Sequence, residues 1–328
     1  MMKTHVPKFM ALALLSLLSM PAVLSFGPAS ISLHQLAACM VGNCENSFVE
    51  MVIWQVRVPR VLVGFVAGAG LACAGAILQN TTRNPLADPY LFGIVSGAAL
   101  GATIASLTLS DQMTVALPLA AFLGALLSVV IVLLIAKALR RMELLLLAGV
   151  AVSFMLGSIS QFLLYIGEPF ASNRVLFWLM GSLARVEMVH FYVIAPVVIL
   201  ALLVVVGYSR QIDALLLGDE SAATLGVNVD RLRLLMMAVC AALTATIVSY
   251  CGGIGFVGLM IPHIVRHWIG VTTLPLIIGS SMVGGCFLLW VDVLARSAFA
   301  DLEIPIGIIT SALGSIFFLF VMHRSIKS

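Results

Sequence analysis

Long apolar runs separated by short polar stretches occupy most of this chain. A helix needs about 20 apolar residues to cross the hydrocarbon core of a bilayer. Ten runs approach that length, the eighth being glycine-rich and short: 9–26, 61–78, 91–109, 115–136, 144–166, 191–208, 234–250, 252–265, 274–295 and 304–322. The pattern therefore predicts an all-α membrane protein, a polytopic bundle of ten transmembrane helices forming one domain over residues 1–328.

The composition agrees with a membrane bundle. Only 9% of the residues are charged and 62% are hydrophobic, whereas soluble domains are about one quarter charged. Lys3 and Lys8 precede the first run as they would in a signal peptide, but the run is longer than a typical signal core and no A-x-A site follows it. We therefore expect an uncleaved first span.

The basic residues orient the bundle, because cytoplasmic loops are enriched in Lys and Arg. With the N-terminus inside, the outer side receives five of the 17 basic residues: Arg57, Arg60, Arg174, Arg185 and Arg296. Omitting the eighth span would move Arg324 and Lys327 outside, so the bias supports that span. Both termini are predicted to be cytoplasmic.

Two cytoplasmic connections are unusual. In "NTTRNPLADPYLFG" (80–93), Pro85 and Pro89 fix the backbone, and the preceding Asn84 and Asp88 are disfavoured in helical geometry. A rigid turn between helices is the simplest interpretation. The second connection, 208–235, predicts a short helix over 219–225, which either docks a soluble partner or only connects two spans.

Four motifs resemble one known family. "RVPRVLVGFVAGAGLACAGAILQNTTRNPLADPYLFGIVSGAALG" is similar to the second and third spans of FecCD-type permease subunits, which serve iron-chelate and cobalamin ABC importers. "LLGDESAATLGV" resembles that family's ATPase coupling region. "GGIGFVGLMIPHIVRHWIG" and "WVDVLARSAFADLEIPIGIITSALGSIFFLF" resemble its C-terminal signatures. The four motifs occur in order over nearly the whole chain.

The resemblance implies a type II ABC importer permease in the bacterial inner (plasma) membrane. Its partners would be a second permease copy or close paralogue, two ATPase subunits and a periplasmic substrate-binding protein. ATP and Mg would bind the ATPase, and this chain would bind no cofactor and catalyse no reaction. In agreement, the sequence has no G-x-x-x-x-G-K-[ST] phosphate loop and no basic tract for nucleic acid. The family's second to fifth and seventh to tenth spans form an inverted repeat.

The cargo is less well defined. A ferric siderophore is favoured because it dominates the family, while haem and cobalamin importers share the motifs. A secondary transporter driven by an ion gradient is an alternative from another class. Such carriers usually bury several ionisable residues, whereas Asp292 is the carboxylate that lies well inside a predicted span.

The resemblance also assigns site residues. Asn84, Pro85 and Leu86 correspond to the cytoplasmic gate. Where relatives carry small hydroxyl residues in the second gate element, this chain has "RME" at 141–143. The coupling region, about 210–231, contributes Leu217, Gly218, Asp219, Glu220, Ser221, Ala222, Leu225 and Gly226 to the ATPase contact.

On the outer face, Arg57, Arg60 and Arg296 match positions that receive acidic residues of the binding protein. The arginine fork suits carboxylates, although most interfacial arginines only anchor a helix by snorkelling. Asp292 precedes Arg296 by four residues, which favours a helical ion pair. Proton coupling is the alternative for Asp292.

The remaining candidates are weaker. Ser153, Ser160 and Gln161 are polar residues of the fifth span that either line the pathway or form a helix seam. His263 and His267 share a helix face but have no evident third ligand, so we interpret them as structural, and no C-x-x-C pair indicates a metal site. Two cysteines share an outer loop, Cys39 and Cys44, and can pair if that loop faces an oxidising compartment. The other cysteines fit as small hydrophobic residues.

Overall fold

The computed structural model describes residues 6–27, 31–44, 46–108, 113–139, 143–299 and 302–327. All regular elements in these ranges are helical. They are α1 (Val6–Ser25), α2 (Leu33–Met40), α3 (Ser47–Met51), the π-helical turn η2 (Val52–Arg57), α4 (Val58–Thr82), the 3₁₀ turn η3 (Pro89–Phe92), α5 (Ile94–Thr108), α6 (Met113–Leu139), α7 (Glu143–Ile166), α8 (Pro169–Leu179), α9 (Met188–Leu215), α10 (Asp219–Thr224), α11 (Val229–Cys251), α12 (Val257–Ile269), α13 (Thr273–Ser297) and α14 (Ile306–Lys327).

Each of the ten apolar runs overlaps one long or medium-length helix. Among the described residues, eight helical stretches are long and apolar enough to cross a membrane, and the stretch that includes α4 extends over Ser47–Thr82. The other two runs fall on shorter helices, α5 with 15 residues and α12 with 13. The all-α membrane bundle is thereby confirmed.

The eighth predicted span is misplaced in sequence. Residues 252–256 form an extended loop before α12, because Gly252 and Phe256 both have positive φ, 72° and 67°. A left-handed backbone cannot continue an α-helix. The helix therefore begins at Val257 and ends at Ile269, beyond the predicted end at residue 265.

The packing is reciprocal between the two halves of the chain. Helix α4 packs against α12 and α13, and α11 packs against α5 and α6. The helices α5 and α12 occupy corresponding positions in the two halves, and both follow an interrupted connection. The first helix of each half thus packs against helices of the other half, as expected for an inverted repeat. The two halves show no convincing sequence similarity.

Small residues allow these helices to approach closely. A Cβ atom added to Gly75 of α4 would lie 1.8 Å from the Gly258 carbonyl oxygen of α12, and one added to Gly68 would lie 2.3 Å from the Gly284 carbonyl oxygen of α13. Such backbone contact is typical of helix packing in membranes. Helix α4 is therefore the buried centre of the bundle.

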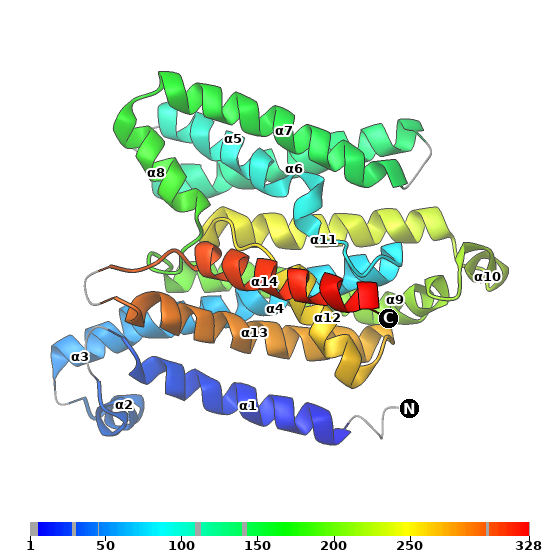
Figure 1. The fold of residues 1–328 in the computed structure, drawn as a ribbon. Helices are drawn as coiled ribbons and strands as arrows, with labels where there is room; N and C mark the ends of the chain where they lie inside the picture. Colours follow the sequence, from blue (N-terminus) through cyan, green and yellow to red (C-terminus); the bar gives the residue numbers. More distant parts are fainter. Residues whose placement is uncertain are drawn as a thin grey trace.

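The ends of the bundle differ in their short elements (Figure 1). The start of α1, the end of α14 and the small helix α10 lie at one end, and α2, α3 and α8 lie at the other. Helices α5, α6 and α7 group together on one side, and α1 lies beside α13 on the opposite side. Helices α2, α3 and α8 were not predicted, because they are short and have no sustained apolar run.

Candidate functional site

The connection between α4 and α5 has an exposed first half and a buried second half. Pro85 and Leu86 are exposed, whereas Ala87, Asp88 and Pro89 are buried. The Asn84 side-chain oxygen accepts a hydrogen bond from the Leu86 amide at 2.9 Å, which closes a tight turn. The predicted gate residues therefore protrude as one compact turn from the end of the bundle that carries α10.

The buried half of this connection is anchored in the core. The Asp88 carboxylate accepts a hydrogen bond from the Tyr90 amide at 2.8 Å and so begins the η3 turn. The Tyr90 hydroxyl in turn accepts the Ile254 amide at 2.9 Å. The two interrupted connections, one from each half of the chain, are thus hydrogen-bonded to each other.

Helix α10 confirms the short helix predicted over 219–225, ending one residue earlier. Its Ala222 is fully buried against the bundle, while Glu220 and Ser221 are exposed. Leu217 and Leu225 on either side are 69% and 66% exposed. Gly218 and Gly226 have positive φ and mark the two ends of the helix. The short helix and its two flanking leucines therefore expose both apolar and polar side chains at the surface.

Asp219 connects α10 to two other elements. Both of its carboxylate oxygens accept hydrogen bonds from Arg233 of α11 at 2.8 Å, and one also accepts from Arg83 at 2.9 Å. The hydrogen bonds from Arg233, with the charges of Arg233 and Arg83, lower the pKa of the Asp219 carboxyl below its ordinary value. Asp219 is therefore charged at neutral pH. The sequence identified Asp219 only as a contact for the ATPase, because its partners are distant in the chain.

The last turns of α4 collect further polar contacts. Gln79 donates to the Gly258 and Leu259 carbonyls at the start of α12, each at 3.3 Å. Asn80 donates to the Val271 carbonyl and the Thr273 hydroxyl, each at 3.1 Å. The end of α4, from which the connection to α5 starts, is therefore tied to α12 and to the start of α13.

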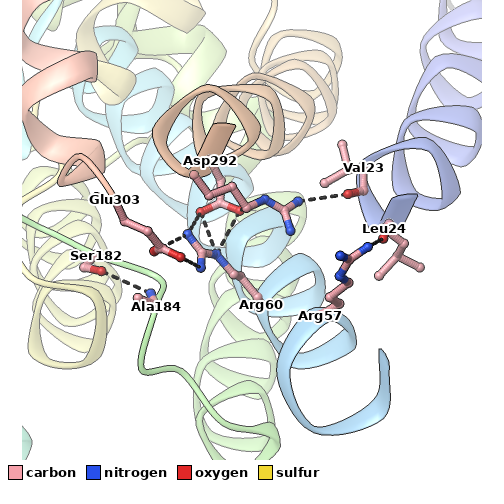
Figure 2. A network of polar contacts seen from close by, with 9 residues as sticks. Val23, Leu24, Arg57, Arg60, Ser182, Ala184, Asp292 and Glu303 are labelled. Carbon is pink, nitrogen blue, oxygen red and sulfur yellow. Dashed lines mark hydrogen bonds and ion pairs between the residues drawn. The ribbon is translucent and has the colours of Figure 1, made fainter. Parts of the chain in front are cut away.

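The three outer arginines are buried rather than exposed. Arg57, Arg60 and Arg296 are 3–5% exposed. Figure 2 shows the Arg57 guanidinium donating to the Leu24 carbonyl. Arg296 donates to the Val23 carbonyl at 2.9 Å. These carbonyls belong to the last turn of α1, where a helix lacks internal partners and favours cations.

Asp292 is the centre of the outer network (Figure 2). The predicted ion pair with Arg296 is present, at 3.4 Å. The sequence missed a closer partner, Arg60, whose Nε lies 2.9 and 3.0 Å from the two Asp292 oxygens. Arg60 also contacts Glu303, which precedes α14, at 3.0 and 3.1 Å. The network joins α4, α13 and α14, so these contacts support a structural role, and docking of a binding protein stays a prediction.

The pathway candidates lie in different surroundings. Ser160 is buried, and its hydroxyl hydrogen-bonds that of Thr103 at 2.8 Å across the seam between α5 and α7. Ser153 bonds back to the Gly149 carbonyl at 2.7 Å, and Gln161 is exposed. The contact of Ser160 matches the seam alternative.

Three other sequence features can be placed. Cys39 and Cys44 form a disulfide between the end of α2 and the segment before α3, at the end of the bundle opposite α10. His267 Nδ1 lies 2.8 Å from the His263 carbonyl oxygen, and the His263 ring packs edge-on against Phe317. Of the second gate element, Arg141 and Met142 lie outside the described residues, as does the side chain of Glu143.

The fold has a solved counterpart. A transporter described as a metal-chelate type ABC transporter, in an inward-facing conformation, matches with a TM-score of 0.87 and 31% identity over 97% of this chain and 99% of its own. The bundle is therefore that of an ABC transporter permease, a protein that spans the membrane many times.

Sequence comparison identifies the family. Residues 11–324 match the model of the FecCD transport family. The chain is 40% identical to the cobalamin import permease BtuC of Halobacterium salinarum, over 84% of this chain and 74% of the relative. It is 37% identical to the hemin transport permease HmuU of Yersinia pestis, over 94% of each chain. It is 35% identical to the Fe(3+) dicitrate permease FecD of Escherichia coli, over 83% and 85%. The chain belongs to the FecCD transport family and is a permease of its iron-chelate, haem and cobalamin ABC importers.

Proposed function

We propose that this chain is the permease subunit of an ATP-driven importer that carries a ferric siderophore from the periplasm to the cytoplasm. The observation that carries the proposal is α10, a surface helix with two exposed leucines at its ends, tied by Asp219 to the gate connection. A transporter that works without an ATPase subunit would not need such a surface helix for docking one. The relatives named for hemin and Fe(3+) dicitrate support an iron complex as cargo.

The proposed assembly contains two copies of this permease, two ATPase subunits and a periplasmic binding protein in the inner membrane. ATP and Mg bind the ATPase, which contacts Leu217, Gly218, Glu220, Ser221, Leu225 and Gly226 of the coupling region. Of the two other residues predicted for this contact, Ala222 is fully buried against the bundle and Asp219 is engaged by Arg233 and Arg83. Both termini are cytoplasmic in this arrangement, since the start of α1 and the end of α14 share the end of the bundle with α10. The chain forms a single permease domain, binds no cofactor of its own and performs no catalysis.

Asn84, Pro85 and Leu86 form the cytoplasmic gate in this proposal. Leu86 is 46% exposed and projects from a turn that Asn84 closes. A gate needs two discrete positions, and a compact turn can move as one unit. We expect Leu86→Ala to change the amount of cargo moved per ATP hydrolysed at least twofold. Uptake and phosphate release measured together test this, and a ratio equal to that of the unsubstituted chain would remove Leu86 from the gate.

The alternatives differ in cargo or in energy source. A haem or cobalamin cargo keeps the whole assembly. A proton-driven carrier requires an ionisable group within the bundle that can cycle its proton, whereas Asp292 is 1% exposed and forms ion pairs with both Arg60 and Arg296. Breaking such a buried pair is costly, so the contacts of Asp292 argue against proton coupling.

Uptake into proteoliposomes containing the full assembly separates these alternatives. The vesicles are supplied with a ferric siderophore, haem or cobalamin together with the cognate binding protein. Internal ATP, a proton gradient or a sodium gradient is then the energy source. We expect ferric siderophore uptake that depends on ATP and is unaffected by ionophores. Preferential uptake of haem or cobalamin would correct the cargo, and uptake driven by a gradient without ATP would refute the proposal.

A further inference from the structure

Asp219 holds two arginines whose surroundings differ. Arg233 is buried, with a side chain 10% exposed, and its Nε also donates to the Thr81 carbonyl of α4 at 3.3 Å. Arg83 is 42% exposed and forms one bond, from Nη2 to the Asp219 carboxylate. The Arg233 pair therefore connects α10 to α11 and to the last turn of α4, whereas the Arg83 pair is a more exposed contact between α10 and the residue that follows α4.

Arg83 lies at the point where α4 becomes the gate connection. It is the C-terminal cap of α4 and has a left-handed backbone, φ 54°. A non-glycine residue in that conformation disrupts the helix and starts a new chain direction. Its peptide neighbour is Asn84, whose side chain closes the exposed turn on the Leu86 amide. If the Arg83 side chain is displaced, the backbone of the adjacent Asn84, the first residue of the proposed gate, is displaced with it.

The opposite end of the gate connection is held in place. Ala87 and Asp88 are buried, and the η3 turn is tied through Tyr90 to the Ile254 amide. A force applied at Arg83 therefore acts on the exposed segment 83–86 against an anchored second half. Among the described residues, the ion pair between Arg83 and Asp219 connects the start of α10 directly to the segment 83–86.

We propose that the ion pair between Arg83 and Asp219 transmits the movement of α10 to the cytoplasmic gate, so that Arg83 is a positioning residue for gating. The inference rests on the proposed function, because it needs an ATPase seated on α10. Arg83 itself is not part of the ATPase contact assigned to the coupling region. Its removal is therefore expected to separate ATP hydrolysis from gate movement.

The test follows the gate directly and needs no cargo. In the assembled complex with its cognate ATPase, Leu86→Cys is labelled with an environment-sensitive maleimide, and the fluorescence change on adding Mg-ATP and vanadate is recorded. We expect Arg83→Gln to reduce that change at least fivefold while the ATPase still copurifies and hydrolyses ATP. Arg83→Lys, which keeps one charged donor, should retain at least half of the change. Arg174→Gln, an exposed arginine of α8 at the opposite end, should retain all of it.

The possible results separate the inference from the proposed function. A full fluorescence change in Arg83→Gln would overturn the inference and leave the importer proposal intact. Loss of ATPase binding in Arg83→Gln would also overturn it, because Arg83 would then seat the motor rather than transmit its movement. If the unsubstituted complex neither binds the ATPase nor responds to nucleotide, the proposed function fails and the inference fails with it.

Discussion

The Asp292→Ala substitution is expected to lower the free energy of unfolding by about 3–5 kcal/mol, because it removes the buried carboxylate that forms ion pairs with two buried arginines. Arg60 is 5% exposed and Arg296 is 4% exposed, and both form ion pairs with Asp292. The unfolding midpoint of the purified chain in detergent micelles measures the loss.

Glu303→Gln is the matched control for this substitution. Glu303 bonds to the same Arg60, but its side chain is 39% exposed. Exposed pairs contribute only about 0–1 kcal/mol, so this variant should unfold close to the unsubstituted chain. Equal midpoints for Asp292→Ala and Glu303→Gln would show that the outer network does not hold the bundle together.

The second large effect is expected where α4 touches α12. In Gly75→Ala, the new methyl group would lie 1.8 Å from the Gly258 carbonyl oxygen, so the two backbones must separate. We expect a loss of about 2 kcal/mol or more, in the range of overpacked cores. The unfolding midpoint again provides the measurement.

Gly207→Ala gives a change of the opposite sign. This glycine lies within α9, and no atom is found within 4 Å of the added Cβ. Alanine should stabilise the helix there by roughly 0.5–1 kcal/mol, because glycine is more flexible in the unfolded chain. If Gly75→Ala were as stable as Gly207→Ala, the close contact of α4 with α12 would be refuted.

The sequence predicted the features that depend on local pattern. Apolar runs located the ten helices, and the acidic residues and glycines around 218–226 located α10. The spacing of Asp292 and Arg296 predicted their pair, because four residues place two side chains on one helix face. The start of α12 was missed because glycine-rich segments are apolar in any conformation.

The polar networks could not be predicted from one sequence. Arg60 and Asp292 are 232 residues apart, and Arg83 and Asp219 are 136 apart. The packing of the helices brings these residues together. The family assigned roles to Asp219 and Arg60 separately, and neither role indicated which partners the folded chain supplies. The gate, coupling and pathway roles themselves stay predictions.

In the proposed importer, an ATPase binds α10 on the cytoplasmic side and drives the movement of the bundle. The most direct test uses Leu217→Cys in two measurements. In the purified complex, its cross-linking to the ATPase is recorded. In intact right-side-out vesicles, its labelling by an impermeant maleimide is compared with that of Phe170→Cys of α8. We expect Leu217→Cys to cross-link to the ATPase and not to react with impermeant maleimide added outside. Phe170→Cys should react with the same maleimide. Labelling of Leu217→Cys from outside, or its failure to cross-link to any ATPase, would contradict the proposed position of the ATPase on α10.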